Sequence, residues 1–290
     1  MPELQTQTAT NELTSLEIDF ISDYIYKKSG IVLGQSKKYL ITSRLHTVLR
    51  ILKIESAGKL ISELQKQPTQ QLETLVLDAL TTNETLWFRD KKPFDALEKV
   101  VFPRLQAEKK KRELNIWSAA CSSGQEAYSI AMLIDSHNFF NGWKVNIWAT
   151  DISTQIIDKA QTAVYSQMEM NRGLPINFLI KYFSEAGDGA WGLKDRIRQK
   201  VEFQLHNLQS DRVPRSAFDV IFCRNVLIYF DRPTKAKILE NMLKVLEPQG
   251  LLVVGGSEST IGIHDKYSPV RINPAIFYSH EDSRQYWENG

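Results

Sequence analysis

Apolar residues recur at the three- and four-residue spacing of amphipathic helices throughout the first part of the chain. The four helical patterns cover residues 16–30, 37–53, 57–65 and 70–82. No run between them alternates with the two-residue period of a strand. The pattern therefore predicts an all-helical N-terminal domain over residues 15–86, preceded by a flexible leader, residues 1–14.

Short apolar runs alternate with helical patterns in the rest of the chain, residues 87–290. This alternation is typical of a Rossmann-like α/β fold, in which helices connect parallel strands. The predicted strands cover residues 114–119, 144–152, 201–208, 250–259 and 270–279, and the run 218–230 begins as a strand and continues as a loop. We expect the last two strands to be antiparallel. At about 166–200 the alternation stops, which predicts an inserted β-rich subdomain.

The composition is that of an ordinary globular protein. The chain has 290 residues, 42% of them hydrophobic and 24% charged, so it can bury a sizeable core. A formal net charge of +2 disfavours a protein whose surface is covered with basic residues for binding a nucleic-acid duplex. Two cysteines form no disulfide framework, the first residues lack the apolar segment of a signal peptide, and no run reaches the roughly 20 apolar residues of a membrane span. We therefore expect a cytoplasmic protein.

The turn after the first predicted strand of the α/β part carries the main chemical signal. Such a strand, turn and helix place a nucleotide ligand over the helix N-terminus. The turn has one glycine, Gly124, where a diphosphate-binding turn has three, and Glu126 in the first helical turn would repel a phosphate. This disfavours NAD and favours S-adenosylmethionine, whose amino-acid end carries a sulfonium and an ammonium group. Alternatively, Glu126 completes a capping box that begins at Ser123 and only satisfies its own helix terminus.

Polar side chains also follow the other predicted strands. Asp151 ends the second strand, where a carboxylate can accept hydrogen bonds from both ribose hydroxyls. Alternatively, Asp151 or Ser153 caps the next helix. Arg224, Asn225 and Tyr229 follow the fourth strand, at the end where open α/β sheets place their sites. No cluster has the spacing of metal ligands, of a Ser/His/Asp triad or of a phosphate-binding loop.

Residues 81–90 mix hydroxyl and amide side chains with aromatic ones. Either Thr82 or Asn83 caps a helix and Arg89 pairs on the surface, or the segment contacts a ligand. The residues alone leave both interpretations open.

The predicted helix over residues 37–53 is strongly basic, with five lysines and arginines and no acid. Arg50 lies on its polar face, whereas Arg44 falls nearer the apolar side, where an unpaired charge is costly. The helix presents either a solvated face or a docking surface for an acidic macromolecule. The residues alone favour the solvated face.

Several of these segments are found together in one known family. The chain contains, in this order, TTNETLWFRD, IWSAACSSGQEAYSIAM, IWATDIS, HNL and IFCRNVLIYF. It closely resembles the chemotaxis receptor methyltransferases, the CheR family, from about residue 21 to residue 278. The resemblance implies S-adenosylmethionine as cofactor, S-adenosylhomocysteine as product, and no metal.

The resemblance also implies roles for individual residues. Asn83, Thr85 and Arg89 are implied to lie in the cofactor site, with Arg89 at the methionine carboxylate or the substrate. Glu126 is implied to bind the methionine ammonium and Asp151 the ribose. The remaining implied site residues are Asn207 and Leu208 at the adenine, Arg224 and Asn225 along the pocket, and Tyr229 beside the transferring methyl group.

Members of this family form γ-methyl esters of glutamate side chains on the cytoplasmic helices of chemoreceptors. The resemblance therefore favours a docking role for Arg44 and Arg50. The insertion after Phe183 is a few residues shorter than in members that also bind a receptor's C-terminal pentapeptide, so we expect no such tether. A monomer that binds no nucleic acid is the expected state.

The expected chemistry agrees with the residues. A glutamate side chain, with an ordinary pKa of about 4.3, is already ionised at neutral pH, so no general base is needed. Arg89 and Tyr229 are the candidate catalytic residues, which would place that carboxylate near the sulfonium. An RNA methyltransferase is an alternative that the near-neutral charge disfavours. A non-catalytic S-adenosylmethionine-binding signalling module is another, which the presence of Arg89 and Tyr229 disfavours.

Overall fold

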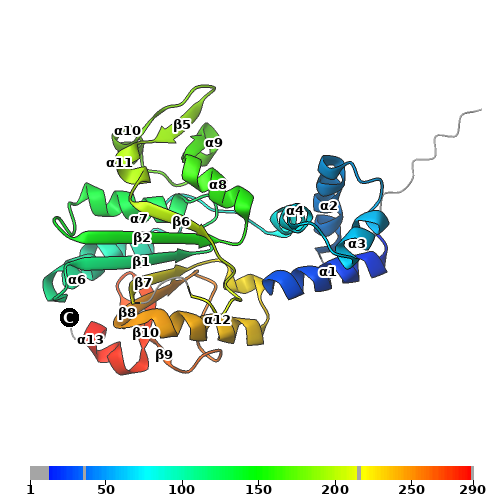
Figure 1. Ribbon diagram of the computed structural model, residues 1–290. Coiled ribbons are helices and arrows are strands. Elements are labelled where there is room, and N and C mark those ends of the chain that lie inside the picture. The colour runs from blue at the N-terminus through cyan, green and yellow to red at the C-terminus, as the bar shows by residue number, and fades with distance from the viewer. Residues whose placement is uncertain (1–12, 35–36, 214–216, 289–290) are drawn as a thin grey trace, which may run out of the picture. The chain divides into compact units, whose positions relative to one another are not determined.

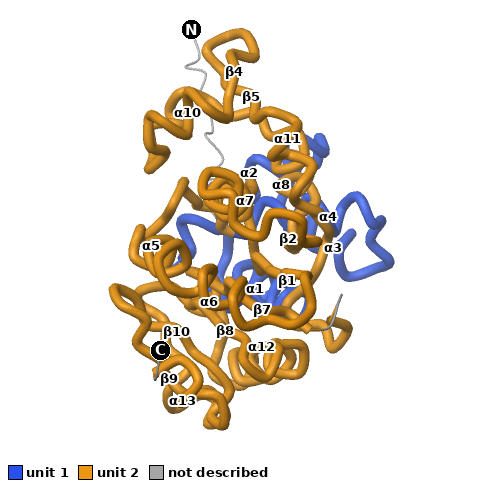
Figure 2. Tube along the Cα trace, turned by 90° about the vertical axis from the view of Figure 1, so that its left-hand side faces the viewer, with its two compact units in different colours: residues 1–81 blue, residues 82–290 orange. Residues whose placement is uncertain are grey.

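The computed structural model describes residues 13–34, 37–213 and 217–288. The chain divides into two compact units, Met1–Thr81 and Thr82–Gly290, which Figure 2 distinguishes by colour. Most of the expected leader, residues 1–12, lies outside the described residues. Among the described residues, no helix is both long enough and apolar enough to cross a membrane.

The described residues of the first unit form four α-helices, as the periodicity predicts. These are α1 (Ser15–Ser29), α2 (Lys38–Leu52), α3 (Ala57–Gln65) and α4 (Gln70–Leu80). Each buries its apolar stripe in one shared core, whose fully buried members include Ile18, Ile21, Ile41, Leu60 and Val76. The all-helical character of this part is therefore confirmed.

Local sequence determines where α1 begins and ends. The Thr14 hydroxyl accepts a hydrogen bond from the Glu17 N–H at 3.2 Å, and the Glu17 carboxylate accepts one from the Thr14 N–H at 2.8 Å. This capping box satisfies N–H groups that a helix start leaves unpaired. At the other end, Gly30 adopts a left-handed φ of 77°, which stops the helix at little steric cost.

The second unit contains a seven-stranded sheet in the order β6-β2-β1-β7-β8-β10-β9 (Figure 1). Its strands are β1 (Glu113–Ala119), β2 (Lys144–Asp151), β6 (Val201–Leu205), β7 (Phe218–Cys223), β8 (Leu246–Val254), β9 (Tyr267–Ile272) and β10 (Ala275–His280). The strands from β6 to β8 are parallel to their neighbours, whereas β10 is antiparallel to both β8 and β9. The Rossmann-like sheet with an antiparallel finish is confirmed.

One strand was predicted wrongly. The single strand expected over residues 270–279 is a hairpin of β9 and β10, with Asn273 and Pro274 between them. Apolar alternation continues on both sides of this two-residue turn, so the pattern alone does not reveal it. Proline has no N–H to donate to a sheet, which is why the strand cannot continue through it.

Helices connect and cover the strands. They are α5 (Lys92–Ala96), the π-helical η2 (Leu97–Val101), α6 (Phe102–Glu108), α7 (Gln125–Ser136), α8 (Thr154–Thr162), α12 (Arg232–Val245) and, after the short 3₁₀ turn η4 (Glu281–Ser283), α13 (Arg284–Glu288). Strand residues alternate between the two faces of the sheet. Ile116 and Phe222 belong to the large core that includes α7, whereas Trp117, Trp148 and Phe218 form an aromatic group with ring centres 5.5–6.5 Å apart.

The expected insertion forms a separate three-stranded antiparallel sheet in the order β3-β5-β4. It consists of β3 (Val164–Ser166), α9 (Gln167–Met170), α10 (Ile176–Tyr182), β4 (Phe183–Glu185), β5 (Ala190–Leu193) and α11 (Asp195–Arg198). Trp87 anchors it, because its ring lies edge-on to Tyr165 at 4.9 Å and to Phe183 at 5.4 Å. The Tyr165 hydroxyl also donates to the Ser123 carbonyl at 2.8 Å, which joins the subdomain to the turn after β1.

Candidate cofactor site

The turn between β1 and α7 has an unusual backbone. Ala120, Ser122 and Gly124 all have positive φ, of 56°, 51° and 91°. A Cβ on Gly124 would lie 3.1 Å from the Phe203 ring and 3.2 Å from the Ala160 Cβ, so this position has little room for a side chain. Glycine adopts a positive φ readily, whereas alanine and serine give no local signal for that conformation.

Asp151, at the end of β2, supports this turn. One of its carboxylate oxygens accepts from the Ser122 N–H at 2.9 Å and the other from the Ser153 N–H at 3.1 Å. Of the two residues that could cap the next helix, Ser153 is the N-cap of α8, since its hydroxyl accepts from the Ile156 N–H, and Asp151 is not. Asp151 therefore holds the turn at the carboxyl ends of β1 and β2, where a ribose is expected to bind in such sheets.

Glu126 does not complete a capping box. The N-cap of α7 is Gly124, which has no side chain to cap the helix. Instead, the Glu126 carboxylate accepts from the Ser118 hydroxyl at 2.8 Å and pairs with the Arg224 guanidinium at 3.1 Å. The capping alternative is wrong because the charge is directed across the strand ends rather than back to its own helix.

Arg224 lies at the centre of this group. Its side chain is 1% exposed, and besides Glu126 it binds the Asp90 carboxylate at 2.7 Å and the Arg89 carbonyl at 2.9 Å. A buried guanidinium is tolerated when carboxylates and carbonyls surround it in this way. With one cation between two carboxylates, the group keeps a formal charge of −1, which still suits a cationic ligand.

The two buried cysteines indicate that several acids share this edge of the sheet. Burial raises the pKa of the Cys121 thiol well above its usual range, and the charges of Asp151 and Glu126 raise it further. Burial likewise raises the pKa of Cys223, with additional effects of Glu258 and Glu126. The charge of Glu126 therefore raises the pKa of thiols at the carboxyl ends of two neighbouring strands, β1 and β7.

Residues 82–90 approach the same group through their backbone. The Ser122 hydroxyl donates to the Asn83 carbonyl at 2.8 Å, and the Arg89 carbonyl accepts from Arg224. No helix begins at Thr82 or Asn83, so the capping alternative for this segment is wrong; α5 begins only at Lys92. Thr85 lies half-buried between these two attachment points.

Three other expected site residues lie at strand ends. Asn207 and the buried Leu208 follow β6, and the Asn207 side-chain oxygen accepts from the Gln209 N–H at 3.0 Å. Tyr229 ends the 3₁₀ turn η3 (Leu227–Tyr229) after β7 and is half-buried. The structure thus puts all three after parallel strands.

The basic helix α2 gives its two arginines different surroundings. Arg44 donates to the Thr81 carbonyl, the C-cap of α4, at 2.8 Å, which satisfies the charge that the sequence places near the apolar side. Arg50 is exposed. Arg44 therefore makes a contact within the helical unit, whereas the Arg50 side chain faces solvent.

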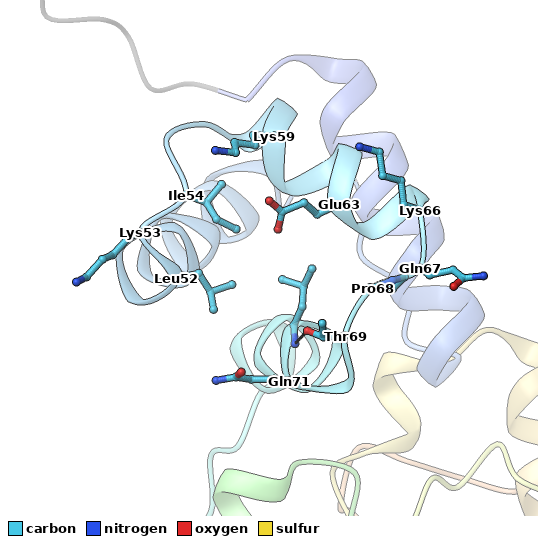
Figure 3. A pocket seen from close by; sticks show the side chains of 11 residues that line it. Leu52, Lys53, Ile54, Lys59, Glu63, Lys66, Gln67, Pro68, Thr69 and Gln71 are labelled. Carbon is cyan, nitrogen blue, oxygen red and sulfur yellow. Dashed lines mark hydrogen bonds between the residues drawn. The ribbon is translucent and has the colours of Figure 1, made fainter.

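The first unit also has a groove away from Arg44 and Arg50. It has a volume of about 460 Å³ and lies between the end of α2, α3 and the start of α4. Figure 3 shows Leu52 and Glu63 directed into it and Lys53 directed away. A second hollow of about 460 Å³ in the other unit adjoins Asp219, near the amino end of β7. The residues that line this second hollow do not include the acidic group at the carboxyl strand ends.

Comparison with known proteins agrees with this geometry. A model of the SAM-binding domain of CheR methyltransferases matches residues 83–276, and a model of their all-alpha domain matches residues 16–81. The chain belongs to the CheR methyltransferase family. Its activity is S-adenosylmethionine-dependent methylation in chemotaxis, so the predicted family, fold and cofactor are confirmed.

Curated relatives match over nearly their whole length. Chemotaxis protein methyltransferase Cher2 of Pseudomonas putida is 40% identical over 268 residues, which are 91% of this chain and 98% of that protein. A chemotaxis protein methyltransferase of Vibrio parahaemolyticus is 42% identical over 89% of this chain and 94% of its own. Chemotaxis protein methyltransferase 1 of Pseudomonas aeruginosa is 42% identical over 88% and 94%.

Unsatisfied polar atoms fit the cofactor of this family. Among the described residues, the buried Asn225 Oδ1 and Arg224 Nε atoms have no hydrogen-bond partner. Buried polar atoms are normally paired, so these two are available to a polar ligand at the strand ends. In the described part of the chain, no three histidine, cysteine or acidic side chains are grouped as metal ligands.

Sequence reasoning missed two acids in this region, Asp90 and Glu258. Asp90 binds Arg224, and Glu258 follows β8 and accepts hydrogen bonds from the loop that follows β7. Glu258 could have been found by the rule that identified Asp151, since it also follows a parallel strand. Asp90 gave no such signal, because its partner is 134 residues away in the sequence.

Proposed function

We propose that this methyltransferase forms γ-methyl esters of glutamate side chains on the cytoplasmic helices of chemoreceptors. The observation that carries the proposal is the state of Arg89. In the described part of the chain its guanidinium has no carboxylate partner and donates only to the Glu84 carbonyl at 3.2 Å, whereas Arg224 and Arg172 are both paired with acids. A half-exposed, unpaired guanidinium beside a cofactor site suits an anionic substrate group.

The chain's own residues have three tasks in this proposal. Glu126 and Asp151 would hold the ammonium and the ribose hydroxyls of the cofactor, while Asn83, Thr85, Asn207, Leu208, Arg224 and Asn225 complete its site. When bound, S-adenosylmethionine supplies a methyl group on a positively charged sulfur. Arg89 would pair with the glutamate carboxylate and the Tyr229 hydroxyl would orient it. Because that carboxylate is ionised at neutral pH, no side chain has to remove a proton.

The basic helix α2 would provide docking. Residues 37–53 contain five lysines and arginines, and there is no acid between Ile31 and Ile54. This positive charge would attract an acidic receptor segment. Arg50 would attract the receptor by its charge. Arg44 would do the same while it keeps its hydrogen bond to the Thr81 carbonyl. We further propose that the enzyme acts as a monomer, without nucleic acid and without a receptor pentapeptide tether.

One assay tests the substrate class. The enzyme is incubated with tritiated S-adenosylmethionine and either a chemoreceptor cytoplasmic fragment or RNA. Base-labile volatile counts from the receptor fragment support carboxyl esters. Base-stable counts in RNA would contradict the proposal, as would cofactor binding with no transfer to either acceptor.

A variant tests the role of Arg89. Arg89→Ala should lower receptor methylation roughly 10²-fold, because the reacting carboxylate would lose its positioning partner. Arg284→Ala is the matched control, since Arg284 is half-exposed and its one ion pair among the described residues is with Glu288 on α13. If Arg89→Ala turned over as fast as the control, Arg89 would have no catalytic role.

A further inference from the structure

Glu258 has an unusual set of partners. One carboxylate oxygen accepts from the Asn225 N–H at 2.6 Å and from the Gly255 N–H at 2.7 Å, and the other accepts from the Ile228 N–H at 3.2 Å. All three donors are backbone groups, and none is within a regular strand. A carboxylate that accepts several N–H bonds fixes the backbone around it strongly, since hydrogen bonds to a charged group exceed neutral ones in strength.

These bonds join two loops that the chain order separates. Asn225 and Ile228 belong to the loop after β7, whereas Gly255 and Glu258 follow β8, the neighbouring parallel strand. Asn225 has a left-handed φ of 58°, so its N–H is presented in a conformation that needs support from outside the loop. Beyond the ends of β7 and β8, where no strand-to-strand hydrogen bonds remain, the Glu258 carboxylate therefore connects the two loops.

Gly255 is required for this arrangement for a steric reason. A Cβ at this position would lie 2.6 Å from the nearer Glu258 carboxylate oxygen, 2.8 Å from the Asn225 side-chain nitrogen and 2.9 Å from the Asn225 backbone nitrogen. No side chain fits at these distances. The glycine and the glutamate therefore act as one unit around the Asn225 backbone.

The loop held in this way carries two expected site residues. Asn225 is one of them, and Tyr229 directly follows Ile228 in the 3₁₀ turn η3. We propose that Glu258 is a positioning residue for methyl transfer, which acts by fixing the backbone of residues 225–229 and, through it, the Tyr229 hydroxyl. This inference rests on the proposed role of Tyr229, whereas the backbone effect itself does not depend on the substrate.

The test compares Glu258→Gln with Glu281→Gln in the full-length enzyme. Glutamine preserves the size of the side chain but replaces one accepting oxygen by an NH₂ group, which cannot accept a bond from an N–H. Glu281 is exposed and belongs to the short turn η4. Methylation kinetics, S-adenosylhomocysteine affinity by calorimetry, and amide hydrogen exchange of a peptide covering residues 224–230 are measured for both variants.

We expect Glu258→Gln to lower kcat about tenfold while the KM for S-adenosylmethionine changes less than about threefold, because the cofactor is held mainly at β1 and β2. Amide exchange of residues 224–230 should rise roughly fivefold without faster exchange in the peptide that covers β1. The control variant should match the wild type in both measurements.

Two results would overturn the inference. One is a kcat within twofold of the wild type with unchanged exchange at residues 224–230. The other is faster exchange throughout the second unit, with an activity loss that only follows the folded fraction, because Glu258 would then act on stability alone. If no receptor methylation occurs even in the wild type, the proposed function fails, and the exchange measurement still decides whether Glu258 fixes this loop.

Discussion

Replacing Arg224 by methionine is the most direct perturbation of the candidate site. The side chain is 1% exposed and is bonded to Glu126, Asp90 and the Arg89 carbonyl. Methionine is unbranched, fills irregular spaces and has a volume close to that of arginine, so the variant removes the charge with little change in packing. The carboxylate of Glu126, whose side chain is 12% exposed, would then be left without its cation.

The size of the effect follows from the two exposures. Removing one partner of a buried ion pair costs about 3–5 kcal/mol, most of it from the charge left behind. Asp90 is 51% exposed, so water can solvate its charge once Arg224 is gone. Only the charge of Glu126 then stays buried without a partner. We therefore expect a loss of unfolding free energy at the lower end of that range, about 3 kcal/mol. For a unit of roughly 200 residues this corresponds to a decrease in Tm of about 6–12 °C.

A double-mutant cycle tests this explanation. Glu126→Gln alone should cost about 1 kcal/mol, because Arg224 retains Asp90 and the Arg89 carbonyl. In the double variant the uncompensated charge is absent, so we expect a favourable coupling of about 2 kcal/mol between the two substitutions. Urea unfolding at pH 7 measures all four proteins, and calorimetry with S-adenosylhomocysteine should show weaker binding for each variant.

The reasoning would be refuted by simple additivity. If Arg224→Met and Glu126→Gln destabilised the protein independently, the charge of Glu126 would not be the source of the cost. An Arg224→Met variant within about 0.5 kcal/mol of the wild type, the range of ordinary surface substitutions, would show that the cluster contributes nothing to stability.

Three further predictions concern other parts of the chain. Gly124→Ala should lower stability by about 1–2 kcal/mol, because φ is 91° there and the new Cβ would crowd neighbouring side chains; thermal unfolding measures it. Burial lowers the pKa of His206 below its ordinary 6.5, so protons bind the unfolded chain more readily and stability should fall as the pH falls below about 6.5; His206→Gln should reduce the difference between urea midpoints at pH 7.5 and 5.5, and an unchanged difference would contradict this. Arg44→Gln should cost about 1 kcal/mol through its lost bond to the Thr81 carbonyl, and Arg50→Gln less than about 0.5 kcal/mol, whereas both should weaken binding of an acidic receptor fragment in a titration at low salt.

The first strand and helix of the α/β unit show how far local patterns lead. The apolar run of β1 and the spacing in α7 predict both elements within a residue or two, because each depends on neighbours at most four positions away. The conformation of the turn between them does not follow in the same way. Ala120 and Ser122 are left-handed, and the Ser122 N–H donates to Asp151 at the end of another strand, a contact that no local pattern reveals.

The acidic group gives a second case. The sequence indicates that Glu126 carries a charge at a helix start and that Arg224 is costly unless paired, but it leaves open whether Glu126 only caps its helix. The two residues are 98 positions apart in the sequence. They are in contact because β1 and β7 are neighbours in the sheet, although β2 and β6 lie between them in the sequence. The order of strands therefore decided between two interpretations that are equally compatible with local sequence.

The sequence by itself determined the helical first unit, the alternation that builds the sheet, the carboxyl-end position of the candidate site and the family to which the chain belongs. Those properties follow from periodicity and from motifs within a few residues of each other. The tertiary structure alone decided that Arg224 pairs with Glu126 and Asp90, that Arg89 has no acidic partner among the described residues, and that Glu258 holds the loop after β7. The reason is physical: the pairing of a buried charge depends on which strand ends the sheet brings side by side, and that is a property of the folded chain.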